Sequence, residues 1–381
     1  MIGEPRPEQA ELLSSVRRFG ERVLTPELAR AVDNEHSFPA DVYRQMADLG
    51  WLGIPFPEEY GGAGSDVMTM FLVIEELCRA MLAAGNIYFR NVVNGGLNVL
   101  ASGNEQQKQL LLPPLIRGEL RMCYAMTEPD AGSDVSNIRT RAIDLGDHFE
   151  ISGTKVFITG AAESDWIQLF ARTGDAPRDI TTFLVDTRSP GIGFTEIPKL
   201  GNNAMKTYEV VFDRVLVPTD MMLGEVDRAW SHVRRSLDLE RVAVATECVG
   251  AARDCFELAL SYAQQRVQFG QPIVQFQGIQ HKLAEMRIDL EASRLLTYRA
   301  AELVLAGADA GLHAAMAKYH TGLTYFRCAI DGMSILGGYG YTTHFAMERH
   351  LRDSALYRIV PGPEVLKNTI AQRILREGAT T

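Results

Sequence analysis

The sequence predicts an α+β protein in which a small antiparallel β domain separates two helical domains. Apolar residues recur every three or four positions from about residue 7 to 118 and again from about 226 onward, which is the period of an amphipathic helix. Between these stretches the pattern changes to short β-rich runs separated by turn residues. We therefore expect an N-terminal helical domain over 1–120, a middle β domain over 121–225 and a C-terminal helical domain over 226–381.

The N-terminal helices are marked by their spacing and their ends. Apolar residues between 12 and 23 and between 42 and 49 fall at helical intervals. Pro39 suits the first turn of the second of these segments, and Gly50 suits its end. A glycine-rich loop at 61–64 then precedes a longer helix.

The middle and C-terminal domains are distinguished by the length of their apolar segments. Strands are expected near 149–152, 167–171 and 208–212, each bounded by Gly, Pro, Asn or Asp. After them, a four-helix-bundle-type domain is expected, with helices over 228–266, 275–306, 309–336 and from about 364.

Composition excludes several function classes. The chain has 381 residues, a net charge of -10 and a pI of about 5.4, so wholesale nucleic-acid binding is not expected. No apolar run is long enough to span a membrane, and no signal peptide is visible, which predicts a cytoplasmic protein. The five cysteines form no Cys-x-x-Cys pair, and the histidines lack partners at ligand spacing, so no metal site is predicted.

Two segments of the middle domain carry polar or aromatic groups at strand ends. Gly132-Ser133 follows an acidic turn and offers backbone N–H groups and a hydroxyl to an anionic or carbonyl-bearing ligand. A turn with only a structural role would look the same. About thirty residues later, Phe157 and Thr159 place an aromatic ring and a hydroxyl at the end of a strand.

Taken together, the motifs resemble the acyl-CoA dehydrogenase family of FAD-dependent flavoproteins. The family's Thr-Glu-Pro-Gly-Ala-Gly-Ser-Asp signature reappears at 127–134 with one change, and its Trp-Ile-Thr-Asn signature appears at 157–160 as Phe-Ile-Thr-Gly. Its Arg-x-x-Phe-Gly segment lies at 266–270 and its Phe-Gln-x-Ile-Gln segment at 276–280, and Gly-Gly-x-Gly-Tyr lies at 337–341. The resemblance covers nearly the whole chain in the family's order.

The resemblance implies FAD as the cofactor and assigns residues to it. Phe157 would cover a flavin ring, and Thr159 would donate a hydrogen bond near flavin N5. Arg266 and Phe269 would come from a neighbouring subunit, with the guanidinium on the pyrophosphate. A site shared in this way implies a homotetramer or a homodimer. The full cofactor set is Tyr124, Met126, Thr127, Gly132, Ser133, Phe157, Thr159, Arg266, Phe269, Gln277, Ser334, Gly337 and Gly338.

Two positions assign the catalytic base: the family's usual loop position lacks a glutamate, and a helix position carries one. Most relatives supply the base from a Glu-Gly-Thr loop, where this chain has Pro361-Gly362-Pro363. Another branch, which includes isovaleryl-CoA dehydrogenase, supplies it from the helix after the β domain, one residue before an Arg, and Glu240-Arg241 matches that arrangement. A structural ion pair is the alternative role for Glu240, and Glu364 is a weaker candidate for the base. Ser133, Asp238 and Arg241 are predicted to contact substrate.

The resemblance therefore implies an acyl-CoA dehydrogenase that oxidises a short, branched or modified acyl-CoA. Glu240 would remove the α-proton, flavin N5 would take the β-hydride, and electrons would pass to an electron-transfer flavoprotein. Three alternatives remain: an acyl group carried on an acyl-carrier protein, an enoyl-thioester reductase, and a non-catalytic flavin-binding homologue. Crotonobetainyl-CoA reductase and the prolyl-carrier-protein oxidases share the pattern. Arg90, Asn91 and Asn94 fall where relatives line the acyl pocket. Surface placement is the expected reading for them, but if any points inward, a polar or branched acyl group is favoured.

Overall fold

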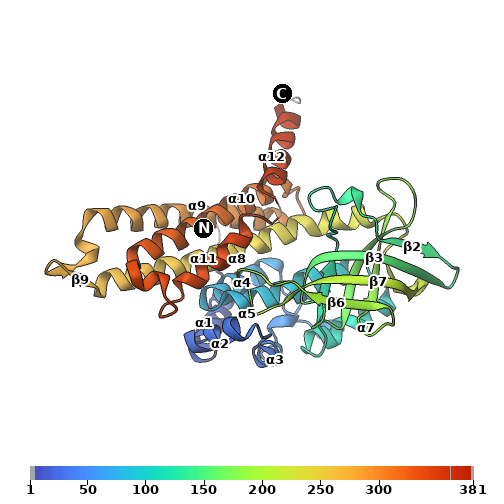
Figure 1. Ribbon diagram of the computed structural model, residues 1–381, viewed down its shortest axis with the longest axis horizontal. Coiled ribbons are helices and arrows are strands. Elements are labelled where there is room, and N and C mark those ends of the chain that lie inside the picture. Colours follow the sequence, from blue (N-terminus) through green and yellow to red (C-terminus); the bar gives the residue numbers. More distant parts are fainter. Residues whose placement is uncertain (1–4, 361, 379–381) are drawn as a thin grey trace.

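The structure, a computed structural model, describes residues 5–360 and 362–378, with backbone only at 231–235 and 377–378. It confirms the predicted order of a helical domain, a β domain and a second helical domain (Figure 1). No helix of the described chain is both long and apolar enough to cross a membrane.

The N-terminal domain is built around one almost completely buried helix. In α4, every residue from Thr69 to Cys78 is buried, and the helix packs between α1 and α8. Pro39 lies at the N-cap of α3, one residue outside the predicted first turn. Gly50 ends that segment in the left-handed conformation, at a φ of 76°. The domain comprises α1 (Pro7–Arg22), α2 (Pro26–Glu35), α3 (Ala40–Asp48), α4 (Val67–Ala80), α5 (Leu82–Tyr88), a π-helical segment (Phe89–Leu97), α6 (Asn98–Ser102) and α7 (Glu105–Ile116).

The middle domain is one eight-stranded sheet with its own apolar core. The strand order is β6-β7-β3-β2-β4-β5-β8, and β1 pairs with β4. The predicted antiparallel arrangement holds except at β4, which pairs in parallel with both β1 and β2. The strands are β1 (Met122–Ala125), β2 (Arg141–Asp144), β3 (His148–Thr159), β4 (Trp166–Arg172), β5 (Ile180–Asp186), β6 (Ile192–Glu196), β7 (Thr207–Pro218) and β8 (Met222–Leu223).

The C-terminal domain packs long helices side by side, with a short hairpin at the end far from the sheet (Figure 1). The hairpin, β9 (Val267–Gln268) and β10 (Gln271–Pro272), joins α8 to α9. The last helix extends away from the body in Figure 1. The helices are α8 (Ala229–Gln265), α9 (Gln277–Leu305), α10 (Gly311–Leu336), α11 (Met347–Tyr357) and α12 (Pro363–Gly378), of which α11 was not predicted.

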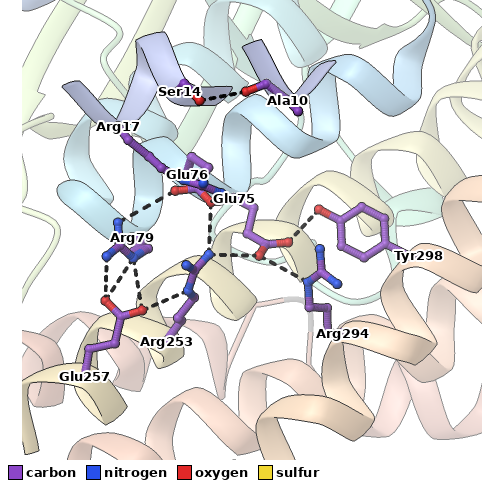
Figure 2. Close-up of polar contacts among 10 residues, drawn as sticks. All are labelled: Ala10, Ser14, Arg17, Glu75, Glu76, Arg79, Arg253, Glu257, Arg294 and Tyr298. Atoms are coloured by element: carbon purple, nitrogen blue, oxygen red, sulfur yellow. Dashed lines mark hydrogen bonds and ion pairs between the residues drawn. The ribbon is translucent and has the colours of Figure 1, made fainter. Parts of the chain in front are cut away.

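An ion network ties the two helical domains together (Figure 2). Glu75 and Glu76 of α4 are buried, with side chains 3% and 4% exposed. Arg253 of α8 lies 3.6 Å and 3.0 Å from the two carboxylates, respectively. Arg17 of α1 reaches Glu76 at 2.7 Å, and the Tyr298 hydroxyl of α9 donates to Glu75 at 2.5 Å. Helices from both ends of the sequence therefore share one set of charges.

Replacing Glu76 with Gln is expected to destabilise the protein by about 2 kcal/mol at neutral pH, because hydrogen bonds between charged groups are lost from a buried position. Burial raises the pKa of Glu76, but its arginine partners outweigh this and hold the pKa below its ordinary 4.5. The contribution is therefore present above pH 4.5 and is lost as the pH falls through the folded-state pKa. Thermal unfolding midpoints across acid pH should show a shallower decline in E76Q than in wild type. E119Q, which removes the exposed partner of Arg117, is the control, and equal curves for E76Q and E119Q would contradict the expectation.

Candidate active site

The predicted base, Glu240, lies on α8 beside a buried lysine. Its side chain is 31% exposed, and its Oε1 lies 3.8 Å from Nζ of Lys318 on α10. Burial raises the pKa of the Tyr124 phenol well above its ordinary value, and the negative charge of Glu240 raises it further. Glu240 of α8 is therefore near enough to Tyr124 of β1 for its charge to act on the phenol. Glu240 is therefore partly accessible and flanked by groups from two other elements.

The predicted substrate residues next to Glu240 form a loose charge pair. Nη1 of Arg241 lies 3.5 Å from Oδ1 of Asp238, and the two side chains are 8% and 24% exposed. Nε of Arg241 is buried and has no hydrogen-bond partner among the described residues. Burial raises the pKa of Asp238, which Arg241 lowers in part. An unused donor of this kind is rare in a folded protein and is suited to a ligand oxygen.

A buried ion pair fixes the segment that carries the predicted flavin contacts. Lys155 of β3 is fully buried, and its Nζ lies 2.8 Å from Oε1 of Glu128. The same ammonium donates to the Met126 carbonyl oxygen at 3.0 Å, and the Val156 amide donates to the Thr127 carbonyl oxygen at 2.9 Å. Met126 and Thr127 are thus held against β3. The predicted set did not include Lys155 or Glu128.

Phe157 is displayed on the surface by a strained backbone. The pairing of β3 with β7 shifts register between Lys155 and Ile158. Within this bulge, Phe157 has a φ of 60° and remains 64% exposed. Positive φ is uncommon for a residue other than glycine, and such strain gathers at functional sites. An exposed ring in this position is suited to cover a planar ligand. Thr159 lies two residues further along, with its hydroxyl 3.5 Å from that of Thr207.

The glycine–serine turn meets the loop after α11. Gly132 and Ser133 are both exposed. A Cβ added to Gly362 would lie 3.6 Å from Oγ of Ser133. Pro361 lies outside the described residues. The contact of this loop with the glycine–serine turn is therefore described through Gly362 alone. Glu364 lies in the first turn of α12, is 75% exposed and pairs weakly with Lys367 at 3.8 Å. This is the position of a helix-dipole carboxylate rather than that of a water-poor base.

The residues predicted to hold the pyrophosphate surround a hollow of about 550 Å³ at the far end of the bundle. Arg266, Gly337 and Gly338 line it. Gly337 has a φ of 60°, and a Cβ added to Gly338 would meet no atom within 4 Å. Among the described residues, no carboxylate lies within ion-pair distance of Arg266. A guanidinium without a carboxylate partner beside open glycine backbone is suited to a diphosphate.

The other predicted residues near this hollow are exposed. Phe269 is 95% exposed and has a φ of 51°. Gln277 begins α9 and Ser334 lies near the end of α10, and neither is among the residues that line the hollow. Within one chain, α8 separates this hollow from Glu240. The 26 residues from Glu240 to Arg266 correspond to about 39 Å of helix.

A second carboxylate lies deeper in the bundle. Glu247 of α8 is 1% exposed and accepts hydrogen bonds from Nδ2 of Asn86 at 3.2 Å and from the Tyr357 hydroxyl at 3.3 Å. Arg90 points inward and donates from Nε to Asn86 at 3.2 Å. Burial raises the pKa of Glu247 to about 7. The predicted set did not include Glu247 or Lys318. Each is a single charged residue within a run of mostly small or apolar residues, a pattern that indicates a buried charge.

Asn91 and Asn94 differ in their burial and in their hydrogen bonds. Asn91 is 1% exposed, donates to the Ile87 carbonyl oxygen and accepts from the Met122 amide at 3.0 Å. It therefore fastens the start of β1 to the π-helical segment. The Asn94 carbonyl oxygen accepts from Asn98, and its side chain is half-buried. Among Arg90, Asn91 and Asn94, the described hydrogen bonds connect only Arg90 to Glu247, through the Asn86 side chain.

Comparisons with known proteins agree along the full chain. Models of the acyl-CoA dehydrogenase N-terminal, middle and C-terminal domains match residues 6–119, 123–215 and 227–375. A 3-(aryl)acrylate reductase of Clostridium sporogenes is 38% identical over 97% of this chain and 99% of its own. The caffeyl-CoA reductase-Etf complex subunit CarC of Acetobacterium woodii is 34% identical over 97% and 98%. The structure of butyryl-CoA dehydrogenase from Megasphaera elsdenii is 32% identical, with a TM-score of 0.93 over 98% and 99% of the two chains.

Proposed function

The chain belongs to the acyl-CoA dehydrogenase family, a family of FAD-binding oxidoreductases, and on that premise we propose that it dehydrogenates an acyl thioester with Glu240 as the base. The observation that carries the proposal is the setting of Glu240. It is a partly exposed carboxylate on α8, coupled to Tyr124 and 3.8 Å from a buried ammonium. The family's usual loop position holds Pro361, which has no group that can accept a proton.

The reaction removes one proton and one hydride from adjacent carbons. The α-C–H is a weak acid, so the base must act in a site with little water, and the thioester carbonyl must be polarised as negative charge develops on it. Glu240 takes the α-proton, and the C–H electrons become the new C=C bond as the β-hydride leaves. FAD, when bound, supplies the two-electron acceptor that the β-hydride requires. Ser133, Asp238 and Arg241 are the proposed substrate contacts.

The described residues fit an FAD molecule in two parts. Met126, Thr127, Ser133, Phe157 and Thr159 would hold its ring system, since they gather an exposed aromatic face and polar groups around β3. Arg266, Gly337 and Gly338 would hold its diphosphate. About 39 Å of α8 separates Glu240 from Arg266 of the diphosphate part within one chain, so we propose that a second copy supplies the diphosphate end. A homodimer or homotetramer is therefore the proposed assembly.

Electrons would leave through an electron-transfer flavoprotein. The support is the relative from Acetobacterium woodii, which is named as a subunit of a reductase-Etf complex. The same relative and the aryl acrylate reductase favour a second candidate function, reduction of an enoyl thioester by the reverse of the same chemistry. Glu240 would then deliver the α-proton, so the same residue is central to both directions. A carrier-protein thioester as the substrate is a further alternative.

Anaerobic mixing with a panel of thioesters tests the proposal and identifies the substrate class. The FAD-loaded protein should lose its oxidised-flavin absorbance with at least one of a set of short, branched and aryl-substituted acyl-CoAs. Matching enoyl-CoAs added to the dithionite-reduced protein should restore the absorbance if reduction is favoured. Acylated carrier protein forms a parallel arm. Bleaching only in that arm would identify the carrier-protein alternative, and no bleaching in any arm would contradict the proposed function.

A further inference from the structure

Lys318 is a charged residue in a buried position, where an unpaired charge lowers the stability of the fold. It lies on α10, 6% exposed, against the small residues of α8. Its only ion pair among the described residues is with Glu240, at 3.8 Å. A buried ammonium is stable only if nearby negative charge offsets its loss of hydration. The position of Lys318 therefore depends on the carboxylate that the proposed function uses as the base.

Glu247 is a second source of negative charge for the same ammonium. It follows Glu240 by seven residues, which is two turns, so both carboxylates lie on one face of α8. Both raise the pKa of Lys318. The hydrogen bonds from Asn86 and Tyr357 fix Glu247 in place. Lys318 thus faces one partly exposed carboxylate at the site and one buried carboxylate behind it.

We propose that Lys318 is a positioning residue for the base: its ammonium holds the Glu240 carboxylate in place, and Glu247, on the same face of α8, supports that ammonium from the buried side. The inference rests on the proposed role of Glu240 as the base. It assigns Lys318 no contact with the substrate. It adds a three-residue unit, Glu240–Lys318–Glu247, that spans α8 and α10 and acts on the proton step alone.

The unit should impose a limit on the alkaline side of the pH range of the reaction. Burial lowers the pKa of Lys318, and Glu240 raises it in part. The ammonium is therefore present at lower pH and is lost as the pH rises through its folded-state pKa. The profile of kcat/KM against pH should therefore have an alkaline limb from Lys318. Glu247, with a pKa of about 7, carries its negative charge on the alkaline side of that value.

Other charged or titratable groups around the unit come from five elements. Arg241 and Cys248 of α8 face Lys318. Arg90 lowers the pKa of Glu247. Glu247 in turn raises the pKa of Cys78 and Tyr357. The groups outside α8 are Cys78 on α4, Arg90 on the π-helical segment, Tyr124 on β1 and Tyr357 on α11.

Three substitutions separate positioning from packing, and each is read as kcat/KM against pH on the substrate found in the thioester panel. K318R should remove the alkaline limb, because a guanidinium stays protonated. K318M should lower kcat/KM by about 10- to 100-fold and remove the alkaline limb, because Glu240 loses the cation that positions it. E247Q should move the alkaline limb downward, because Lys318 loses a neighbouring negative charge.

K282M is the matched control, since it removes a lysine that bridges α9 and α10 through Asp331, away from Glu240. It should leave the alkaline limb in place. FAD content and thermal midpoint are measured for every variant. If K318M does not load FAD, E247Q and K318R test the inference. An alkaline limb that stays unmoved in both of these, with turnover intact in wild type, would overturn the inference while leaving the proposed function standing. No turnover in wild type would instead remove the premise.

Discussion

Replacing Glu240 with Gln is expected to lower kcat/KM for the acyl thioester by about 10³-fold, the usual contribution of a general base. The amide keeps the size and hydrogen-bonding capacity of the side chain but cannot accept the α-proton. FAD content should change little, but the thermal midpoint should fall, because Lys318 is left buried without its only ion-pair partner among the described residues. Steady-state kinetics with a dye as the electron acceptor gives the measurement.

E364Q is the matched control for this substitution. Glu364 is the other candidate for the base, and it lies 75% exposed in the first turn of α12. Its replacement should leave kcat/KM within about twofold of wild type, since an exposed first-turn carboxylate contributes little beyond a weak helix-dipole interaction. A large loss in E364Q together with a small one in E240Q would reverse the assignment.

Replacing Lys155 with Met is expected to cost about 3–5 kcal/mol of stability, because it leaves the Glu128 carboxylate buried without its cation. Glu128 would retain the Arg139 and Thr140 amides as hydrogen-bond donors, at 2.5 Å and 2.9 Å, but lose the ammonium at 2.8 Å. The Met126 carbonyl would lose its donor as well, so the flavin-side segment should loosen and retain FAD less well. Thermal unfolding and FAD content after gel filtration report the two effects.

The double variant K155M/E128Q tests the cause of that loss. Removing the charge of Glu128 also removes the uncompensated buried carboxylate, so the double variant should be more stable than K155M alone. Its FAD retention should remain low, because the Met126 carbonyl still lacks the lysine. A double variant that is less stable than K155M would show that packing, rather than charge, dominates at this site.

The order of the three domains was predictable because each domain has its own apolar period. The helical period in α8 and α10 and the short runs of β4 and β7 are local properties of the sequence. Which strands pair with each other is not a local property of the sequence. The parallel pairing of β4 with β1 and β2 depends on which strands meet in space, and α11 follows a glycine-rich turn that interrupts the periodic pattern. The π-helical segment at Phe89–Leu97 contains two glycines and two asparagines, a composition that disfavours a regular α-helix but does not by itself specify π-helical hydrogen bonding.

The same distinction between local motifs and packing explains which site residues the sequence could indicate. Glu240, Phe157 and Arg266 could be proposed from the sequence because each lies in a motif with fixed spacing, and their roles stay predictions. Lys318 and Glu247 lie in no such motif. Their importance comes from the packing of α10 on α8, which brings an ammonium within 3.8 Å of a carboxylate distant in the chain. Glu128 lies within a matched motif and Lys155 lies two residues before the next one, but their pairing depends on the fold of the Glu128 turn onto β3.

Proton exchange measured without hydride transfer tests the role of Glu240 most directly. An acyl-CoA analogue with sulfur in place of the β-carbon has acidic α-protons but no β-hydrogen to transfer. Incubated in D₂O with the FAD-loaded wild-type protein, it should take up deuterium at the α-carbon. With E240Q it should do so only at the rate seen without enzyme. Exchange in E240Q at the wild-type rate would contradict the assignment of Glu240 as the base.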